Sequence, residues 1–504
     1  MRRPERQSDG VRSMTSDTNE SGVTQQQWRK GPLLVLCLGS FMTLLDVTIV
    51  NVAVPRMLAE LRVGLESAGW IISLYTIPLA VFVATFGKLG DVLGKRECYL
   101  VGVALFTLAS AACALAPNIV VLLVARIFQG TGASLLLPQT LAIISTATPK
   151  DKRTTALGVH GSISGIASVL GPLLGGVLVG VVGWRSIFLL NLPLGVIVIV
   201  LGIKILPRTT QERDRRLDWA SVTLMILALS SVTYLLLEGG ARVQNHLAVH
   251  IGMPSAIAVL SGAALYYRLR RTQDRDPLIP FWIFRNPSYR LMSLVWASVS
   301  AAIVITYLPL MVYAQTVLGL SSMAAGLLVT PMFVCTVVVA ACAGRLAKAW
   351  TAHFTLAGGL GLFALGLVGL AVTATETASP MLFVPSLLVA GSGLGATFAT
   401  MQSIAMRDVD PGDSGAASGV INGIRQLSSA LGGAVVVTLL AVGIRLAGLD
   451  ESFSGSPSWQ SAYTDSLQLV LLVPVVLIGL CALLTWRQGV SEKRLMIDNQ
   501  HLVR

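Results

Sequence analysis

The chain has 504 residues, of which 54% are hydrophobic and only 12% are charged, and its mean hydropathy is +0.73. These values exclude an ordinary soluble globular protein and indicate a polytopic membrane protein. The formal net charge of +12 would suggest a nucleic-acid partner in a soluble chain. In a membrane protein, the distribution of Lys and Arg between the loops is the informative quantity instead.

Residues 1–31 are polar and basic and contain no short apolar core followed by a small-residue cleavage site, so we expect a cytoplasmic tail rather than a signal peptide. A membrane-spanning helix needs about 20 apolar residues. The sequence contains fourteen such runs, near 33–54, 69–87, 99–116, 119–142, 156–182, 187–206, 219–237, 248–267, 290–313, 323–343, 354–374, 381–401, 415–443 and 467–486. This pattern predicts an all-α membrane protein with a six-span half over 32–206, a linker with two extra spans over 207–289, a second six-span half over 290–487 and a tail over 488–504.

The basic residues predict the orientation of these spans. If the N-terminus is inside, 30 of the 37 Lys and Arg residues lie in the inner loops and tails, and only five lie in the outer loops. Cytoplasmic loops are rich in Lys and Arg, so both termini are expected in the cytoplasm. The basic charge is then explained by topology, and no nucleic-acid partner is expected.

The first span carries one carboxylate, Asp46, deep inside its apolar run. A charge at a helix centre in a membrane costs roughly 2.5 to 3.5 kcal/mol, so such residues usually face the protein interior and carry protons or ions. The alternative is a neutral, hydrogen-bonded aspartic acid that only holds helices together.

The fourth span carries Arg126 and, one turn later, Gln129. At 1.5 Å per residue, Asp46 and Arg126 both lie about 10 Å from the outer face. An arginine beside Asp46 favours the ionised carboxylate and desolvation disfavours it, so small rearrangements can switch the group between binding and releasing a proton. A static buried ion pair that fixes helix packing is the competing interpretation.

Two further segments have glycines at informative spacings. The inner loop between the second and third spans reads GKLGDVLGKRECYLVG, in which glycines permit a tight turn and charged side chains can hold helix ends together; its residues are Gly87, Asp91, Gly94, Lys95 and Arg96. The fifth span reads GSISGIASVLGPLLGGVLVG, in which small residues allow a neighbouring helix to approach and a proline bends the helix. Its key residues are Gly165, Gly171, Pro172, Gly175 and Gly176, and generic helix packing is the alternative.

The thirteenth span contains SGVINGIRQ, with Asn422, Arg425 and Gln426. Arg425 lies about 15 Å along that helix. It either binds an anionic group or pairs with a carboxylate, or it only bonds to the backbone and to neighbouring side chains, and the sequence does not decide between these. The aromatic residues Trp296, Tyr307 and Phe398 also fall inside spans and are candidate contacts for hydrophobic molecules.

Together these strings resemble the EmrB/QacA drug-resistance branch of the major facilitator superfamily. The matching elements are LDVTIVNVAVP in the first span, the loop containing Asp91, the RxxQGxGxa pattern from Arg126, the stretch GPLLGG in the fifth span, which resembles the antiporter motif GxxxGPxxGG, and the SGxxNxxRQ pattern. The resemblance implies a fourteen-span drug:proton antiporter in the cytoplasmic membrane, with Asp46 carrying the proton and Arg126 sensing protonation. The predicted tenth span lacks the acidic residue that relatives exporting dications often carry.

The resemblance implies small hydrophobic or cationic drug-like substrates, with protons and the lipid bilayer as the other partners. We expect a monomer that is not an enzyme, without catalytic residues, cofactor or metal. No phosphate-binding loop of the GxxxxGK[ST] type occurs, so an ion gradient is the expected energy source. The alternatives are a dedicated exporter of one endogenous metabolite, antibiotic or siderophore, and a non-transporting membrane sensor or intramembrane enzyme.

Overall fold

The computed structural model describes residues 30–207, 218–238, 248–273, 281–349, 351–407, 409, 414–449 and 456–502. Most of the predicted N-terminal tail and the first part of the predicted linker lie outside these residues. The elements of the first half are α1 (Lys30–Leu61), α2 (Glu66–Leu93), α3 (Lys95–Ala114), α4 (Ile119–Ala147), α5 (Lys150–Val181), α6 (Arg185–Leu189) and α7 (Asn191–Ile205).

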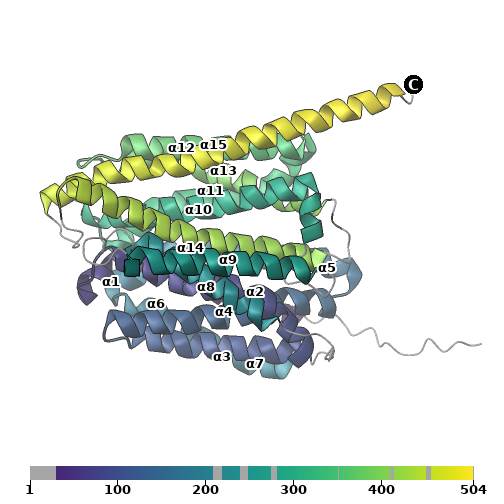
Figure 1. Cartoon of the computed structure of the whole chain (residues 1–504), viewed down its shortest axis with the longest axis horizontal. Coiled ribbons are helices and arrows are strands. Elements are labelled where there is room, and N and C mark those ends of the chain that lie inside the picture. The colour runs from purple at the N-terminus through teal and green to yellow at the C-terminus, as the bar shows by residue number, and fades with distance from the viewer. Residues whose placement is uncertain are drawn as a thin grey trace, which may run out of the picture.

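The connecting segment and the second half are also helical. Between the halves lie α8 (Trp219–Glu238), the π-helical turn η1 (Ala248–Gly252) and α9 (Met253–Arg271). The second half consists of the 3-10 turn η2 (Phe281–Arg285), α10 (Pro287–Thr316), α11 (Ser322–Ala349), α12 (Ala352–Thr373), the 3-10 turn η3 (Pro380–Leu382), α13 (Phe383–Met406), α14 (Ser414–Leu446) and α15 (Pro457–Leu502). The long helices run side by side, with the first half on one side of the bundle and most of the second half on the other (Figure 1).

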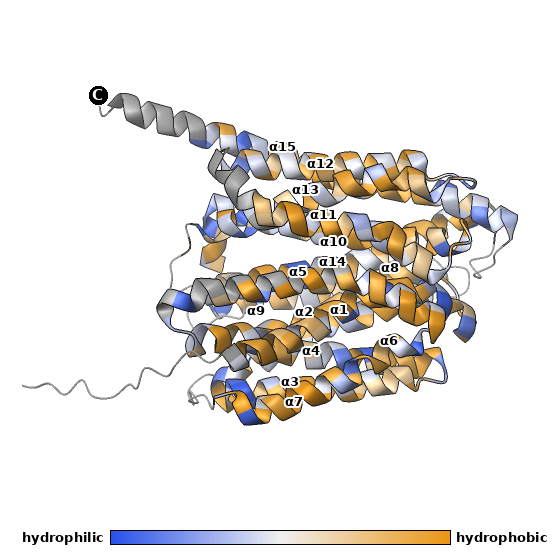
Figure 2. Ribbon diagram, turned by 180° about the vertical axis from the view of Figure 1, so that it is seen from behind, coloured by the Kyte–Doolittle hydropathy of each residue, from blue (hydrophilic) through white to orange (hydrophobic). Residues whose placement is uncertain are grey.

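Twelve helical segments of the described chain are long and apolar enough to cross a membrane. Hydrophobic residues cover much of these helices along their length, and many hydrophilic residues lie near the helix ends (Figure 2). Each of the fourteen predicted runs overlaps a helix, but α5 and α9 are not among the twelve. The all-α membrane architecture is therefore confirmed, while the number of fourteen spans stays a prediction.

The sixth predicted span differs from the single helix that we expected. It is interrupted at Leu190, where α6 ends and α7 begins. Pro193 has no backbone N–H with which to bond the carbonyl of Leu189 four residues earlier, so the regular hydrogen-bond pattern is interrupted there. The break places Asn191 at the first position of α7, where its side chain is buried.

The two halves contact each other through α5 with α11, α2 with α14, and α1 with α10. A β-carbon built on Gly176 would stand 2.8 Å from the carbonyl oxygen of Ser322 and 2.9 Å from the Cα of Met323, so α5 and α11 touch backbone to backbone. Gln315 near the end of α10 donates to the carbonyl oxygen of Val52 in α1 at 3.0 Å. The contacts of Gly176 and Gln315 both lie toward the end of the bundle at which α1 ends and α11 begins.

The connecting helix α8 packs along the seam between α2 and α14. Val222 of α8 is buried in one cluster with Ile77 and Val81 of α2 and Ala430 of α14. The α8–α9 pair is therefore joined to both halves through α8.

Candidate functional site

Asp46 and Arg126 form an ion pair inside the first half. Their residues are 1% and 2% exposed, and Arg126 Nη1 donates to Asp46 Oδ2 at 2.6 Å. The sequence analysis placed both charges at a similar depth, and the structure brings them into direct contact. Two opposite charges that are both removed from water must be compensated by each other and by further hydrogen bonds.

Arg126 makes three further contacts that hold its guanidinium in place. Its Nε donates to the carbonyl oxygen of Ile71 at 3.1 Å, and its Nη1 also donates to Gln129 Oε1 at 2.7 Å. The guanidinium carbon lies 4.3 Å from the centre of the Tyr75 ring, within range of a cation–π interaction. The arginine therefore links α4 to α1 and α2 at one point.

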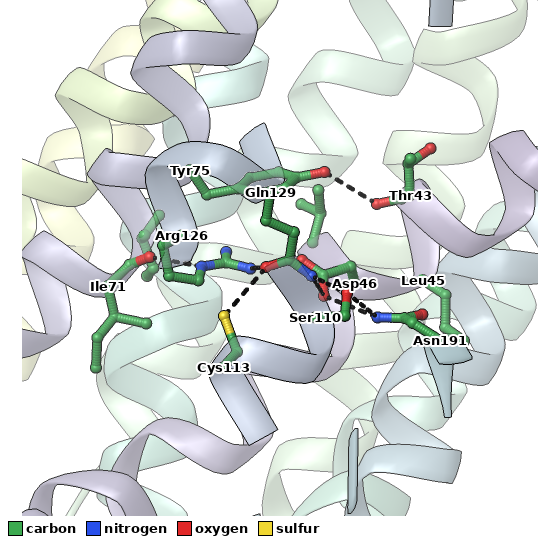
Figure 3. Close-up of polar contacts among 12 residues, drawn as sticks. Thr43, Leu45, Asp46, Ile71, Tyr75, Ser110, Cys113, Arg126, Gln129 and Asn191 are labelled. Carbon is green, nitrogen blue, oxygen red and sulfur yellow. Dashed lines mark hydrogen bonds and ion pairs between the residues drawn. The ribbon is translucent and has the colours of Figure 1, made fainter. Parts of the chain in front are cut away.

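The second oxygen of Asp46 accepts from two amide side chains. Gln129 Nε2 donates to Oδ1 at 2.8 Å and Asn191 Nδ2 donates to it at 3.3 Å. Both amides also donate to Ser110 Oγ, at 2.8 and 3.4 Å. Figure 3 shows these side chains gathered around the carboxylate from α1, α3, α4 and α7.

The contacts of Asp46 determine which protonation state this arrangement suits. Each side chain bonded to its two oxygens presents an N–H group, and a carboxylic acid needs an acceptor for its own proton. A proton on either oxygen would point at one of these N–H groups. The hydrogen bonds that the structure shows are therefore those of a carboxylate.

Sequence reasoning did not identify Ser110, Asn191 or Tyr75 as parts of this cluster. An asparagine inside an apolar run is a usable signal, because an unpaired amide in a membrane is costly. Ser110 and Tyr75 gave no such signal, since serine is common at contacts between membrane helices and tyrosine is common throughout hydrophobic cores.

The predicted inner loop is largely helical, since α2 extends through Gly87 and Gly90 to Leu93 and only Gly94 separates it from α3. Gly94 has a φ of +104°, which is unfavourable for other residues, and its N–H bonds to the carbonyl of Gly90. A β-carbon on Gly90 would overlap the side chain of Gln139 in α4. Gly87 is less constrained, because a β-carbon there would lie 3.6 Å from Pro138, an ordinary contact.

The charged residues of the same segment connect helix ends. Lys95 Nζ lies 3.3 Å from Asp91 Oδ1, which joins the start of α3 to the end of α2. Arg96 Nη2 donates to the carbonyl oxygen of Ile203 in the last turn of α7. The loop therefore holds three helix ends together.

The glycines of the fifth span pack α5 against α1. A β-carbon on Gly171 would overlap the side chain of Thr48, and one on Gly175 would stand 2.8 Å from Ile49 Cγ1. Thr48 and Ile49 follow Asp46 by two and three residues. The motif therefore lies directly against the segment of α1 that carries the buried acid.

The remaining motif residues face the other half or lack a described environment. The carbonyl oxygen of Pro172 would overlap a β-carbon on Gly326 of α11. Gly165 lies in α5, but its surroundings are outside the described part of the chain. The same helix thus contacts α1 through Gly171 and the second half through Pro172 and Gly176.

Arg425 in α14 lies apart from this cluster. Its Nη1 donates to Asn422 Oδ1 at 3.3 Å, and its guanidinium carbon lies 4.5 Å from the centre of the Trp296 ring in α10. The Trp296 and Phe398 rings are 5.7 Å apart. Two of the three predicted aromatic residues are therefore together beside Arg425.

The third aromatic residue, Tyr307, packs against α11. The ring of Tyr307 packs edge-on against Phe333 of α11, at 5.6 Å between centres. Gln426 is half-buried in α14. Among the residues that the structure describes, no three His, Cys, Asp or Glu side chains gather as a candidate metal site.

Comparison with known proteins identifies related chains. A family model described as Major Facilitator Superfamily matches residues 36–433. The chain is 32% identical over 452 residues to the multidrug resistance protein Stp of Mycobacterium tuberculosis, covering 88% of this chain and 81% of that protein. It is 30% identical over 411 residues to the riboflavin transporter RibZ of Clostridioides difficile, covering 81% and 88%.

Among solved structures, the chain is similar in fold to a bacterial homologue of the human lysosomal transporter Spinster. The TM-score is 0.65 over 92% of this chain and 97% of that one. The sequence identity is 16%, so this similarity concerns the fold alone.

Proposed function

The chain belongs to the major facilitator superfamily, and we propose that it is a proton-coupled exporter of hydrophobic drugs or antibiotics from the EmrB/QacA-type branch. In this proposal it has fourteen spans and two cytoplasmic termini, and it works as a monomer in the cytoplasmic membrane. The two halves rock about a central site that opens alternately to each side. The membrane transporters to which it is related support transport rather than enzymatic catalysis.

The observation that carries the proposal is the buried Asp46–Arg126 pair. In the deprotonated state Asp46 accepts from Arg126, Gln129 and Asn191. A proton entering from outside neutralises Asp46 and removes the Coulombic attraction to Arg126, which is then free to take other partners. Release of the proton to the cytoplasm restores the pair. Proton binding and release are thus linked to two arrangements of α1 and α4.

Helix contacts provide a route from this pair to the interface between the halves. Thr48, on the helix of Asp46, packs against Gly171 of α5, and five residues later Gly176 touches Met323 of α11. A shift of α1 that follows protonation would therefore move α5 and strain its contact with α11. In this proposal, that contact separates when the central site opens to the outside. Through this packing, α5 is in contact both with the helix that carries Asp46 and with the second half, so a change at either place can shift its position.

The energy balance permits such an exchange. One proton moving inward releases about 2.3 kcal/mol per 100 mV of membrane potential. A tenfold gradient of a neutral substrate costs about 1.4 kcal/mol.

A dedicated exporter of one metabolite or antibiotic is the second candidate on the same fold. Its support is that the relatives include RibZ, named as a riboflavin transporter, as well as Stp, named as a multidrug resistance protein. A panel of unrelated lipophilic compounds separates the two, because a dedicated exporter moves one chemical type and a multidrug exporter moves several.

The test of proton coupling is uphill transport in proteoliposomes. A fluorescent lipophilic dye is followed while a pH gradient is imposed, with and without an uncoupler. The proposal predicts accumulation against the dye gradient that collapses when the uncoupler is added. Dye movement that only follows its own gradient, at the same rate with the uncoupler, would contradict proton coupling.

A further inference from the structure

Arg425 is an arginine deep in a membrane helix whose charge is not neutralised by a neighbouring acid. It lies eleven residues after the start of α14, about 16 Å along the helix axis. Within the described part of the chain, no carboxylate lies within 4.0 Å of its guanidinium. Among the described residues, its one hydrogen-bond acceptor is Asn422 Oδ1, at a long 3.3 Å, so four of its five N–H donors have no acceptor there.

The comparison with Arg126 shows how unusual this is within one molecule. Arg126 is bound by a carboxylate, an amide oxygen and a backbone carbonyl. Asp46 and Arg126 cancel in charge, whereas the half-buried Arg425 has no compensating carboxylate among the residues that the structure describes. An intramembrane charge of this kind is costly and calls for an acceptor or a counter-charge.

The groups around Arg425 indicate which kind of ligand would fit beside it. Trp296 from α10 and Phe398 from α13 lie in contact, with ring planes inclined by 38°, and the guanidinium lies over the Trp296 ring. Trp296 is 5% exposed, and its indole Nε1 has no hydrogen-bond partner among the described residues. Two kinds of N–H donor therefore lie beside aromatic faces without matching acceptors.

We propose that Arg425, Asn422, Trp296 and Phe398 form a subsite for an aromatic organic anion, meaning a planar ring that bears a carboxylate, phenolate or sulfonate. The ring packs on Trp296 and Phe398, and the anionic oxygens accept from the guanidinium. The inference rests on the proposed transport function and specifies its substrate class. It disfavours the cationic drugs that the sequence analysis included, since a cation at this subsite would be repelled by Arg425.

The test compares three probes that share one ring system and differ in charge. Anthracene-9-carboxylate is an anion, 9-anthracenemethanol is neutral and 9-(aminomethyl)anthracene is a cation at neutral pH. Binding to the detergent-solubilised protein is followed by energy transfer from tryptophan, without a pH gradient. We expect the carboxylate to bind at least about tenfold more tightly than the alcohol, and the amine most weakly.

Variants of Arg425 test whether this residue causes the preference for the carboxylate over the alcohol. Arg425→Gln should bring the carboxylate to within about twofold of the alcohol, because a neutral amide replaces the charged donor. Arg425→Lys should retain part of the preference. Arg445→Gln removes the same charge from the end of the same helix and should leave the preference unchanged. Alcohol binding by Arg425→Gln at the wild-type level shows that the variant is folded.

Two results would overturn the subsite. One is equal affinity for the carboxylate and the alcohol, measured on the wild-type protein alone. The other is a carboxylate preference that survives in Arg425→Gln. Efflux of the same probes from proteoliposomes separates this inference from the proposed function. Uncoupler-sensitive efflux without any charge preference removes the subsite alone, whereas a charge preference without uphill movement contradicts proton-driven export and leaves the subsite intact.

Discussion

The backbone of Gly171 in α5 lies directly against the side chain of Thr48 in α1, two residues beyond the buried acid Asp46. Thr48 is held in place on its own helix, since its Oγ1 donates to the carbonyl of Leu45 at 3.1 Å. The glycine thus allows α5 to approach the segment of α1 that carries Asp46.

Replacing Gly171 by alanine should separate α5 from α1. The added methyl group overlaps Thr48, and overpacking of this kind costs about 1–3 kcal/mol. We expect a lower midpoint of thermal unfolding in detergent and slower transport. Gly361→Ala in α12 is the matched control, because a β-carbon there meets nothing within 4 Å and should change neither quantity. Equal effects of the two substitutions would show that the close approach at Gly171 is unimportant.

The contribution of the Asp46–Arg126 pair to stability can be tested by removing one charged side chain and then both. Arg126→Gln leaves Asp46 buried without its counter-charge, and breaking a buried pair in this way costs roughly 3–5 kcal/mol. Adding Asp46→Asn should recover a large part of this loss, because an amide needs no counter-charge. Thermal unfolding of the single and double variants measures the recovery.

A second double variant serves as the control for this recovery. Asp46→Asn and Arg425→Gln should change the free energy of unfolding additively, because Arg425 bonds to Asn422 and stacks on Trp296 and does not contact Asp46. Additive effects in the Asp46/Arg126 double variant as well would mean that the two charges do not depend on each other for stability.

The α8–α9 pair should show a pH-dependent contribution to stability. Partial burial alone would raise the pKa of Asp218, but hydrogen bonds from Arg268 and Ser221 together with the charge of Arg268 outweigh it and hold the pKa below its ordinary value. Arg268 Nη2 donates to Asp218 Oδ1 at 2.7 Å. A lowered pKa stabilises the folded state above the unfolded pKa of about 3.9, and this stabilisation is lost as the pH falls through the lower folded pKa.

Asp218→Asn keeps a side chain that can still cap α8 and removes only the charge. It should be less stable than the wild type by about 0.2–1 kcal/mol between pH 7 and 5, as expected for a partly exposed pair. The difference should shrink below about pH 3.9. Hydrogen exchange of α8 and α9 in both proteins measures it. The exposed acid Glu376, changed to Gln, serves as the control, and a difference for Asp218→Asn that stays constant down to pH 3 would speak against the pair.

Much of the fold could be predicted because the membrane imposes simple rules. Helix positions follow from apolar runs of sufficient length, and each predicted run overlaps a helix in the structure. The contact between Asp46 and Arg126 was also within reach, since two charges at equal depth in one bundle favour pairing. The glycines of α5 signalled a close helix approach, although not which helix they face.

The whole cluster around the buried acid was harder to predict because its members come from α2, α3, α4 and α7 as well as α1. Hydropathy places each helix along the membrane normal but does not determine its rotation or its neighbours, which depend on packing. Asn191 therefore donates to Asp46, and Ser110 accepts from Asn191 and Gln129, in a way that no single segment reveals. The stacking of Arg425 on Trp296 likewise joins helices far apart in sequence, and the break at Leu190 depended on Pro193 within an otherwise continuous apolar run.

The central claim is that Asp46 carries the proton that drives export. The most direct measurement compares the wild-type protein with Asp46→Asn in proteoliposomes, following efflux of a fluorescent lipophilic dye under an imposed pH gradient, with dye binding measured in parallel. The account predicts uphill, uncoupler-sensitive efflux by the wild type, and loss of this efflux in Asp46→Asn while dye binding is retained. Equal coupled efflux by both proteins would contradict the account and remove Asp46 from the mechanism.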